Sequence, residues 1–237
     1  MWPNIHEAVL KPDESVFEKI YGKGFYQYIK EDVPEYGKFH VEAMTRMSGK
    51  VTGVVLEHYD KEFKSFTGTL VDVGGSQGAT AAIFASKYPN MKCVVNFDLP
   101  DIVSGAPAYR GVEHVGGSFL DFVPKGDMLF LKFVLLNWND EQLLKILKNC
   151  FNALPAKGGK MIIVDRVTPP EAPEDITPRL RMAVQSLLNT SAFQGAKSRK
   201  LKEHQVVAKA AGFASFRIVK SVDTLTFMEA EKAPIMS

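Results

Sequence analysis

The first sixty residues place apolar and charged side chains at helical spacing. Aromatic and aliphatic residues recur every three or four positions between 15 and 60, which is the period of an amphipathic helix. Pro34 divides this stretch, because proline disfavours the helical conformation of the residue before it. We therefore expect one helix before Pro34 and a second from about Glu35 to Tyr59.

After Gly68 the pattern changes to short apolar runs separated by helical segments. Five runs have the length and composition of buried strands, at 69–73, 92–97, 112–115, 128–131 and 160–165. Helical spacing is found at 79–88, 140–153, 177–190 and 201–211, and a proline-rich loop covers 168–173. Two final runs, 216–222 and 224–228, flank Asp223 and predict a hairpin.

Strands that alternate with helices predict βαβ units and a parallel sheet covered on both faces. The closing hairpin adds an antiparallel strand. The pattern therefore predicts a doubly wound α/β domain preceded by a helical leader.

Composition and charge exclude several classes. The 237 residues carry 29 basic and 27 acidic side chains, a net charge of +2, whereas a nucleic-acid surface usually shows a clustered basic excess. No apolar stretch approaches the roughly 20 residues that span a bilayer, and the start lacks the pattern of a signal peptide. We expect a cytoplasmic protein.

Cys93 and Cys150 are too few for a disulfide framework or a cysteine zinc site. We therefore expect buried free thiols and no metal.

The first strand ends in a glycine-rich turn, Val71-Asp-Val-Gly-Gly-Ser-Gln-Gly78. Ligands of open parallel sheets bind beyond the carboxyl ends of the strands, where the strand order reverses. Glycines let the backbone approach a ligand closely, and the following helix presents free N–H groups. Asp98 closes the second strand, twenty residues past Gly78, where a carboxylate can accept both hydroxyls of an adenosine ribose.

Dinucleotide and S-adenosylmethionine sites share this geometry, and two details favour the latter. The turn does not fit G-x-G-x-x-G, because Ser76 and Ala79 stand where the second and third glycines should be. Asp72 adds a carboxylate that would repel a pyrophosphate but suits an ammonium and a sulfonium. A turn that needs glycines only for its bend, and a nicotinamide site, remain the alternatives.

Residues 2–230 resemble the catalytic domain of plant-type small-molecule O-methyltransferases, the caffeate and flavonoid group. The matching segments keep their order and spacing: LVDVGGSQG (70–78), FDLPDIV (97–103), VEHVGGSFLDFVPKGDMLFLKFVLLNW (112–138), DEQLLKILKNCFNALPAKGGKMIIVD (140–165) and AKAAGFASFRIV (208–219). The segment FEKIYGKGFYQYI (17–29) is similar to the family's helices over the active site. The resemblance implies a Rossmann-like methyltransferase sheet of seven strands, the last antiparallel, at 67–237, and a helical leader covering the active site at 1–66.

The resemblance also implies S-adenosylmethionine as cofactor and a small aromatic acceptor. The residues it assigns to the cofactor are Asp72, Gly74, Gly75, Gly78, Asp98, Leu99, Ser118, Phe119 and Lys132. Leu99 and Phe119 would contact the adenine, and Ser118 replaces an aspartate of the family. Trp138 matches a tryptophan of the same segment. The residues expected at the substrate are His40, Met44 and Asp165.

The chain departs from the family at the catalytic base. Leu136 stands where the family has its histidine, and Ser198 aligns with one of two flanking glutamates, the other being Asp165. Leucine cannot take a proton, so the catalytic residue is unknown. Three alternatives remain open: an acceptor that needs no base, such as a ring nitrogen; another base, for which His40 is the best candidate; or a protein that binds cofactor without catalysis.

The resemblance implies a partner as well. Family members dimerise largely through an N-terminal helical domain, and only about 70 residues precede the glycine turn here. We therefore expect a weakened homodimer with apolar surface exposed along the 15–60 helices, and no nucleic-acid or membrane partner.

Overall fold

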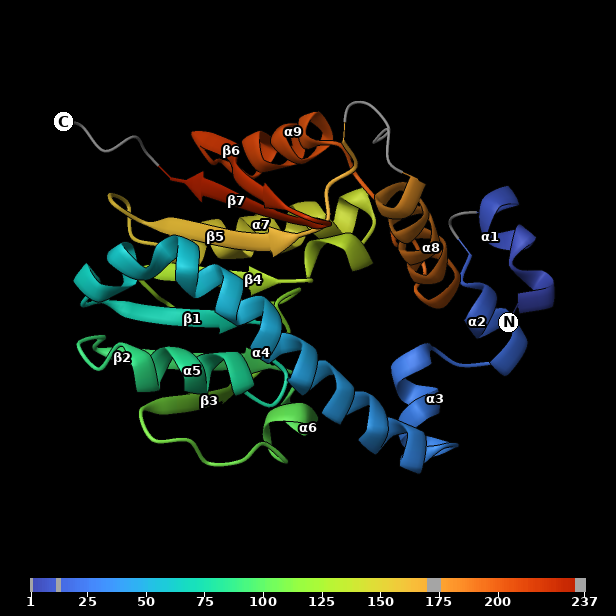
Figure 1. The fold of residues 1–237 in the computed structure, drawn as a ribbon, viewed down its shortest axis with the longest axis horizontal. Helices are drawn as coiled ribbons and strands as arrows, with labels where there is room; N and C mark the ends of the chain where they lie inside the picture. Colours follow the sequence, from blue (N-terminus) through green and yellow to red (C-terminus); the bar gives the residue numbers. More distant parts are fainter. Residues whose placement is uncertain (1, 12–13, 170–175, 233–237) are drawn as a thin grey trace.

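Seven strands form one sheet in the order β3-β2-β1-β4-β5-β7-β6 in a computed structural model that describes residues 2–11, 14–169 and 176–232 (Figure 1). The strands are β1 (Thr69–Val73), β2 (Cys93–Asp98), β3 (Val112–Gly116), β4 (Met128–Lys132), β5 (Lys160–Asp165), β6 (Ser215–Val222) and β7 (Leu225–Glu231). Neighbouring strands are parallel except at β7, which is antiparallel to both β5 and β6. The predicted α/β sheet with an antiparallel last strand is confirmed.

Helices cover both faces of the sheet, because successive strand residues point to opposite sides. One face packs against α7 (Asp140–Ala153) and α9 (Leu201–Ala211) through odd-numbered residues of the first strand, such as Val71. The other face packs against α4 (Pro34–Ser65) and α5 (Ala79–Lys87) through even-numbered ones, such as Leu70 (Figure 1). At the carboxyl ends of the strands, the even-numbered side chains therefore point to the face of the sheet that α4 covers.

The leader differs from the sequence expectation in two places. The single helix expected before Pro34 is divided into α2 (Val16–Tyr21) and α3 (Phe25–Glu31), because Gly22 ends α2 with a left-handed φ of 73°. The second helix, α4, continues beyond Tyr59 to Ser65, because Phe63 lies one turn further along the buried face. A short α1 (His6–Leu10), preceded by a 3-10 turn (Trp2–Asn4), was not expected.

At the carboxyl ends of the strands, α8 (Ile176–Ala192) lies between the sheet and the leader, and α1 and α2 contact it (Figure 1). Two short elements lie at the same edge, α6 (Pro100–Val103) after β2 and a 3-10 turn (Leu135–Asn137) after β4. The proposed division at residue 66 stays a prediction. It falls just after α4, whose C-terminal half packs in the core of the sheet.

The two cysteines differ in environment. Cys150 is fully buried, as expected, and burial raises the pKa of its thiol to about 12. Cys93 is only partly buried and its thiol donates to Glu113 at 3.8 Å, so the expectation of two buried thiols is wrong for Cys93, at the start of β2. Within the described ranges no helix is long and apolar enough to cross a membrane.

Candidate cofactor and acceptor site

The glycine-rich turn lies where the order of the parallel strands reverses, between β1 and its neighbours β2 and β4. Gly74 and Gly78 adopt left-handed φ values of 74° and 83°, which glycine reaches without steric cost. A Cβ on Gly74 would lie 2.9 Å from Val134 Cγ2. Ser76, where the family has glycine, adopts a left-handed φ of 53°. The turn thus exposes a backbone surface that a ligand can approach.

Asp98 lies at the rim of this turn. Its Oδ2 accepts the Ser76 N–H at 2.7 Å and its Oδ1 accepts the Leu99 N–H at 2.7 Å. Each carboxylate oxygen can accept a further hydrogen bond, and the side chain is only partly buried. Burial raises the pKa of Asp98, while the two backbone N–H groups oppose this effect. The arrangement fits the predicted acceptor of two ribose hydroxyls.

Two buried acceptors that have no hydrogen-bonding partner among the described residues lie beneath Gly75. They are Asp72 Oδ2 and Asn96 Oδ1, and a Cβ on Gly75 would lie 2.7 Å from the first and 2.1 Å from the second. Burial raises the pKa of Asp72 to about 7, and the Lys132 ammonium works in the opposite direction. These acceptors give the turn a negative potential, which fits a cofactor with an ammonium and a sulfonium and disfavours a pyrophosphate.

Asn96 holds the turn in place and was not among the expected site residues. Its Nδ2 donates to Ser76 O at 2.9 Å and pairs with His114 Nδ1 at 3.0 Å. His114 Nε2 lies 3.0 Å from Pro107 O, and since a carbonyl only accepts, the proton is assigned to Nε2 and Nδ1 is the acceptor. The available signal was a pair of polar residues inside two strands, which the register Asn96↔His114 brings side by side.

The residues expected at the adenine follow the ends of β2 and β3. Leu99 is 49% exposed. Ser118 Oγ accepts the Leu120 N–H at 3.2 Å, so this hydroxyl also stabilises the local turn. The Phe119 ring lies beside Gly74 and meets the Trp138 ring edge-on at a centroid distance of 5.4 Å.

Lys132 connects the end of β4 to α4. Its ammonium donates to Ser48 Oγ at 2.8 Å. Burial lowers its pKa, and the Asp72 carboxylate opposes this effect. The structure therefore brings the nine residues expected at the cofactor together at the carboxyl ends of β1 to β4.

Two of the three residues expected at the substrate, His40 and Met44, lie on one face of α4, whereas Asp165 ends β5. His40, Met44 and Ser48 are spaced four residues apart, so their side chains follow one another along the helix. The His40 ring packs edge-on against Phe25 at 5.4 Å, and in the described part of the chain its nitrogens make no hydrogen bond. Burial lowers the pKa of His40, so the neutral imidazole, which can accept a proton, predominates at neutral pH.

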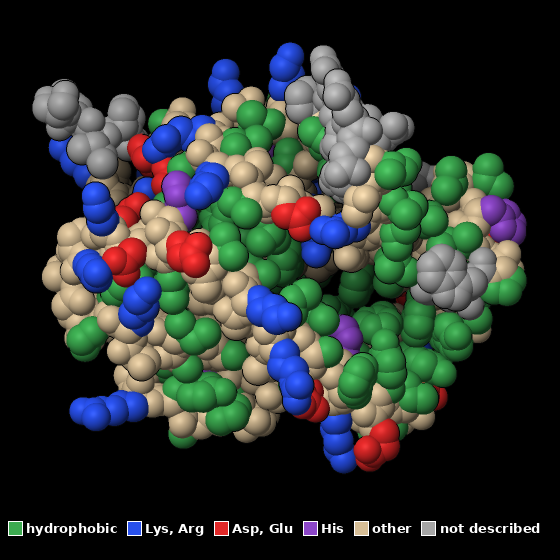
Figure 2. Space-filling model, in the orientation of Figure 1, with side chains coloured by type: hydrophobic (Ala, Val, Ile, Leu, Met, Phe, Trp, Pro, Cys, Tyr) green, Lys and Arg blue, Asp and Glu red, His purple; other side chains and the backbone are tan. Residues whose placement is uncertain are grey.

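Two aromatic residues, missed from the sequence, lie beside His40 and its neighbour Phe25 and form with this face of α4 the acceptor wall. Tyr26 contacts Phe193, which follows α8, at a centroid distance of 5.4 Å. Tyr26 is 58% exposed, yet burial and then the Asp98 carboxylate raise its pKa. The molecular surface is hollowed between α4 and α8, with apolar side chains around the opening (Figure 2).

No titratable side chain occupies the position of the family's base. Leu136 is buried, and its N–H and that of Leu135 donate to Asp165 Oδ2 at 3.3 and 3.0 Å. Asp165 Oδ1 accepts the Arg166 N–H at 2.8 Å, and burial raises the pKa of this carboxyl to about 7. Asp165 therefore holds the backbone around Leu136, and its contact with a substrate stays a prediction. Ser198 Oγ donates to Ser186 Oγ at 2.8 Å.

Comparison with known proteins agrees with this geometry. The family model for the O-methyltransferase domain matches residues 2–214. The flavonoid 3'-O-methyltransferase of Chrysosplenium americanum is 38% identical over 98% of this chain and 65% of its own length. The caffeic acid 3-O-methyltransferase of Ammi majus is 40% identical over 91% of this chain and 57% of its own length. The chain thus spans less than two thirds of the length of these relatives.

Solved structures share the fold. The structure of LaPhzM superimposes with a TM-score of 0.80 at 28% identity, over 97% of this chain and 68% of that one. Human N-acetylserotonin methyltransferase, solved in complex with SAM, gives a TM-score of 0.79 at 22% identity, over 98% and 66% of the two chains. The sheet order, the glycine turn and the sequence match lead to one conclusion: this chain belongs to the O-methyltransferase domain family.

Proposed function

We propose that the protein is an S-adenosylmethionine-dependent methyltransferase that methylates an oxygen of a small aromatic acceptor. The observation that carries the proposal is the cradle beside Asp98, where buried acceptors of Asp72 and Asn96, without a hydrogen-bonding partner among the described residues, lie beneath Gly75, which has no room for a side chain. S-adenosylmethionine, when bound, supplies a methyl group activated by a positively charged sulfur. The relatives named flavonoid and caffeic acid methyltransferases support an aromatic acceptor.

The residues at the cofactor divide into two groups by chemistry. The carboxylate of Asp98 accepts the ribose hydroxyls, and Leu99, Ser118 and Phe119 surround the adenine. Asp72 attracts the positive charges at the other end of the cofactor, and Lys132 keeps the adjoining part of α4 at the strand ends. This charge pattern also disfavours the nicotinamide alternative.

The acceptor must lose a proton as its oxygen bonds to the methyl carbon and the sulfur leaves as a neutral thioether. We assign this proton to His40, which presents a neutral imidazole with no hydrogen-bonding partner among the described residues. A positioned base typically contributes 10²–10⁴-fold to such a step. His40→Ala should therefore lower turnover of a phenol of pKa near 10 by at least about tenfold at pH 7.

Leu136 favours a second candidate function. Leu136 is buried at the position of the family's base, and Ser198 stands in place of a glutamate. Both are also expected of a protein that binds the cofactor without turnover, or of one that methylates a ring nitrogen. Turnover with a panel of phenols and N-heterocycles separates these functions.

The decisive test is Asp98→Ala. The loss of hydrogen bonds to a charged group should weaken cofactor binding by roughly 1.5–3 kcal/mol, measured by calorimetry with S-adenosylmethionine and S-adenosylhomocysteine. Asp98→Asn, which keeps one acceptor oxygen, should lose less, and the exposed Asp121→Ala serves as the control. An unchanged dissociation constant in Asp98→Ala would refute the proposed cofactor site.

A further inference from the structure

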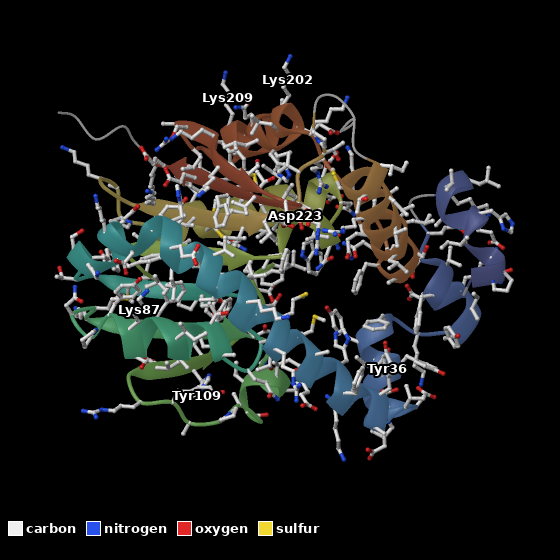
Figure 3. The ribbon with its side chains drawn as sticks, in the orientation of Figure 1. Tyr36, Lys87, Tyr109, Lys202, Lys209 and Asp223 are labelled. Carbon is white, nitrogen blue, oxygen red and sulfur yellow. The ribbon has the colours of Figure 1, made fainter. Side chains whose placement is uncertain are left out.

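A fully buried arginine lies behind the turn that follows β4. Arg199 belongs to the segment between α8 and α9, and its side chain is 0% exposed. The lysines of the neighbouring α9 behave differently, and Lys202 and Lys209 extend into the solvent (Figure 3). An arginine is seldom fully buried unless its charge is paired and its donors are satisfied. The partners of this guanidinium therefore indicate its role.

The guanidinium donates to the 3-10 turn after β4 and to the residue that follows this turn. Its Nη1 lies 3.3 Å from Leu135 O, and its Nη2 lies 2.7 Å from Trp138 O. Nη1 also donates to Lys197 O at 3.3 Å, and Nε and Nη2 reach Asp140 Oδ1 at 2.8 and 2.7 Å. Because the donors of a guanidinium form a rigid planar fork, one group ties both ends of the turn to the segment before α9.

Asp165 holds the N–H groups of the same turn. Its Oδ2 accepts from Leu135 and Leu136, and the Lys197 N–H donates to Leu136 O at 3.2 Å. The free N–H groups of a helical turn carry partial positive charge, and its free carbonyl oxygens carry partial negative charge. A carboxylate at the N–H groups and a guanidinium at the carbonyl oxygens therefore stabilise the turn together.

This turn connects two parts of the site. Leu136, in its middle, stands at the position of the family's base. Trp138, directly after the turn, meets the Phe119 ring edge-on at a centroid distance of 5.4 Å, and Phe119 lies beside Gly74 in the glycine turn. A displacement of the backbone at 135–138 would therefore move the acceptor side and the adenine side of the site together.

We propose that Arg199 is a positioning residue for methyl transfer, because it fixes the turn after β4 and so aligns the acceptor side of the site with the cofactor. Arg199 acts through the backbone that it holds rather than by contact with either ligand. This inference rests on the proposed methyl transfer. A misplacement of about 1 Å can cost on the order of 10²-fold in rate, so kcat is the quantity that Arg199 should control most.

The first readout follows Trp138 without any ligand. Trp2 and Trp138 are the two tryptophans of the chain, so Trp2→Phe leaves Trp138 as the single fluorophore. In this background, Arg199→Lys keeps the charge without the planar fork of donors, and Arg199→Met removes both. Each should lower the fluorescence anisotropy of Trp138 and shift its emission to longer wavelength, at a temperature where circular dichroism shows a folded protein. A role in stability alone would leave both signals of the folded protein unchanged.

The second readout separates rate from binding. Calorimetry with S-adenosylhomocysteine should show roughly three- to tenfold weaker binding in Arg199→Lys. The kcat for caffeic acid, used as the acceptor, should fall further, on the order of 10- to 100-fold.

Gly195→Ala tests the same role with the guanidinium intact. Gly195 has a left-handed φ of 72°, and its Cβ would lie 2.9 Å from Asn139 Cβ. Alanine should therefore push the segment that carries Arg199 away from the residues after the turn, and the changes in Trp138 fluorescence, binding and kcat should follow the pattern of Arg199→Lys. If Arg199→Met does not fold, these two variants decide.

Lys202→Gln is the control, because it removes a positive charge three residues from Arg199 on the exposed face of α9. It should leave all three readouts within about twofold of the wild type. Unchanged Trp138 fluorescence and kcat in folded Arg199→Lys and Gly195→Ala, or an equal loss in Lys202→Gln, would overturn the inference. A wild type that binds no S-adenosylhomocysteine would instead refute the proposed function, and the Trp138 signals would still decide the role of Arg199.

Discussion

At the scale of single residues, Asp72 shows a conflict between folding and binding. Its folded-state pKa of about 7 lies above the ordinary value of 3.8, because burial disfavours the charge. The folded protein therefore binds more protons than the unfolded chain between these values, and the stability contribution of this group falls as pH rises from 3.8 through 7. The charge that destabilises the fold is the one proposed to attract the cofactor.

Asp72→Asn should therefore stabilise the protein without cofactor in a pH-dependent way. We expect the free energy of unfolding of the variant to exceed that of the wild type by about 4 kcal/mol at pH 8, the equivalent of the shift from 3.8 to about 7, and by little at pH 4. Urea unfolding across this range measures the difference, with the exposed Asp121→Asn as control. A difference that does not change with pH would show that Asp72 does not titrate in this window.

The same substitution should weaken binding of the cationic cofactor. In the wild type, affinity for S-adenosylmethionine should rise as pH increases through about 7 and Asp72 becomes charged. Calorimetry at pH 6 and pH 8 should show this rise in the wild type and a flat, weaker affinity in Asp72→Asn. The opposite pH trend would contradict the assigned role.

Leu136 leads to a prediction about the missing base. Leu136→His should raise turnover of a phenol and barely change that of a pyridine-type nitrogen, which has no proton to lose. The gain should fall short of 10²–10⁴-fold, because Ser198 offers no carboxylate to hold the imidazole in one tautomer. Adding Ser198→Glu should increase the gain, as measured by initial rates. Rapid wild-type methylation of an ordinary phenol at pH 7, unaffected by His40→Ala, would show that the base lies elsewhere.

At the scale of elements, α4 joins the leader to the sheet through a single helix of 32 residues, roughly 48 Å long. Its N-terminal half carries His40 and Met44, two of the residues expected at the substrate, and its C-terminal half is packed in the sheet core. Gly49 and Gly53 lie in its middle with no atom within 4 Å of an added Cβ. Packing therefore does not require these glycines, which lower the stability of the helix.

Gly53→Ala should raise the free energy of unfolding by about 0.5–1 kcal/mol, since alanine lowers the conformational entropy that helix formation removes. Gly37→Ala, near the start of the same helix, should be destabilising, because its Cβ would lie 2.6 Å from Ile29 O. Thermal and urea unfolding of the pair provide the comparison. Equal effects at the two positions would mean that Gly37 does not lie against the Ile29 carbonyl.

The elements differ in how far the sequence predicts them. Buried parallel strands are mainly apolar runs, as in the first four residues of β4, and this signal located each of them. The break at Gly22 was missed, because the apolar residues keep the same spacing whether the segment forms one long helix or two short ones. The glycine turn was predictable because its residues are contiguous, whereas Asn96 with His114, or Tyr26 with Phe193, meet only through strand register and packing between distant segments.

At the scale of the whole molecule, the leader and α8 leave apolar side chains in contact with solvent. Leu10, Phe39 and Ile176 are 75%, 65% and 69% exposed, and apolar side chains gather over this end of the molecule (Figure 2). Their elements lie at the end of the sheet that carries the cleft (Figure 1). Apolar surface of this extent usually marks an interface.

We therefore expect the protein to self-associate through this end, in line with the homodimer that the family resemblance implies. Light scattering and analytical ultracentrifugation should show concentration-dependent association that Leu10→Glu weakens, because a carboxylate would have to lose its hydration in the contact. Val206→Glu is the matched control, since Val206 is also highly exposed, at 69%, but lies on α9, which covers the face of the sheet opposite α4. Equal weakening by both substitutions would indicate non-specific aggregation, and a monodisperse monomer at high concentration would contradict the interface.

If the association is specific, it brings the leader helices of two copies together beside their clefts. Leu10→Glu should then also loosen the cover over the acceptor wall. This effect is measured as a weaker affinity for the acceptor with an unchanged affinity for S-adenosylhomocysteine.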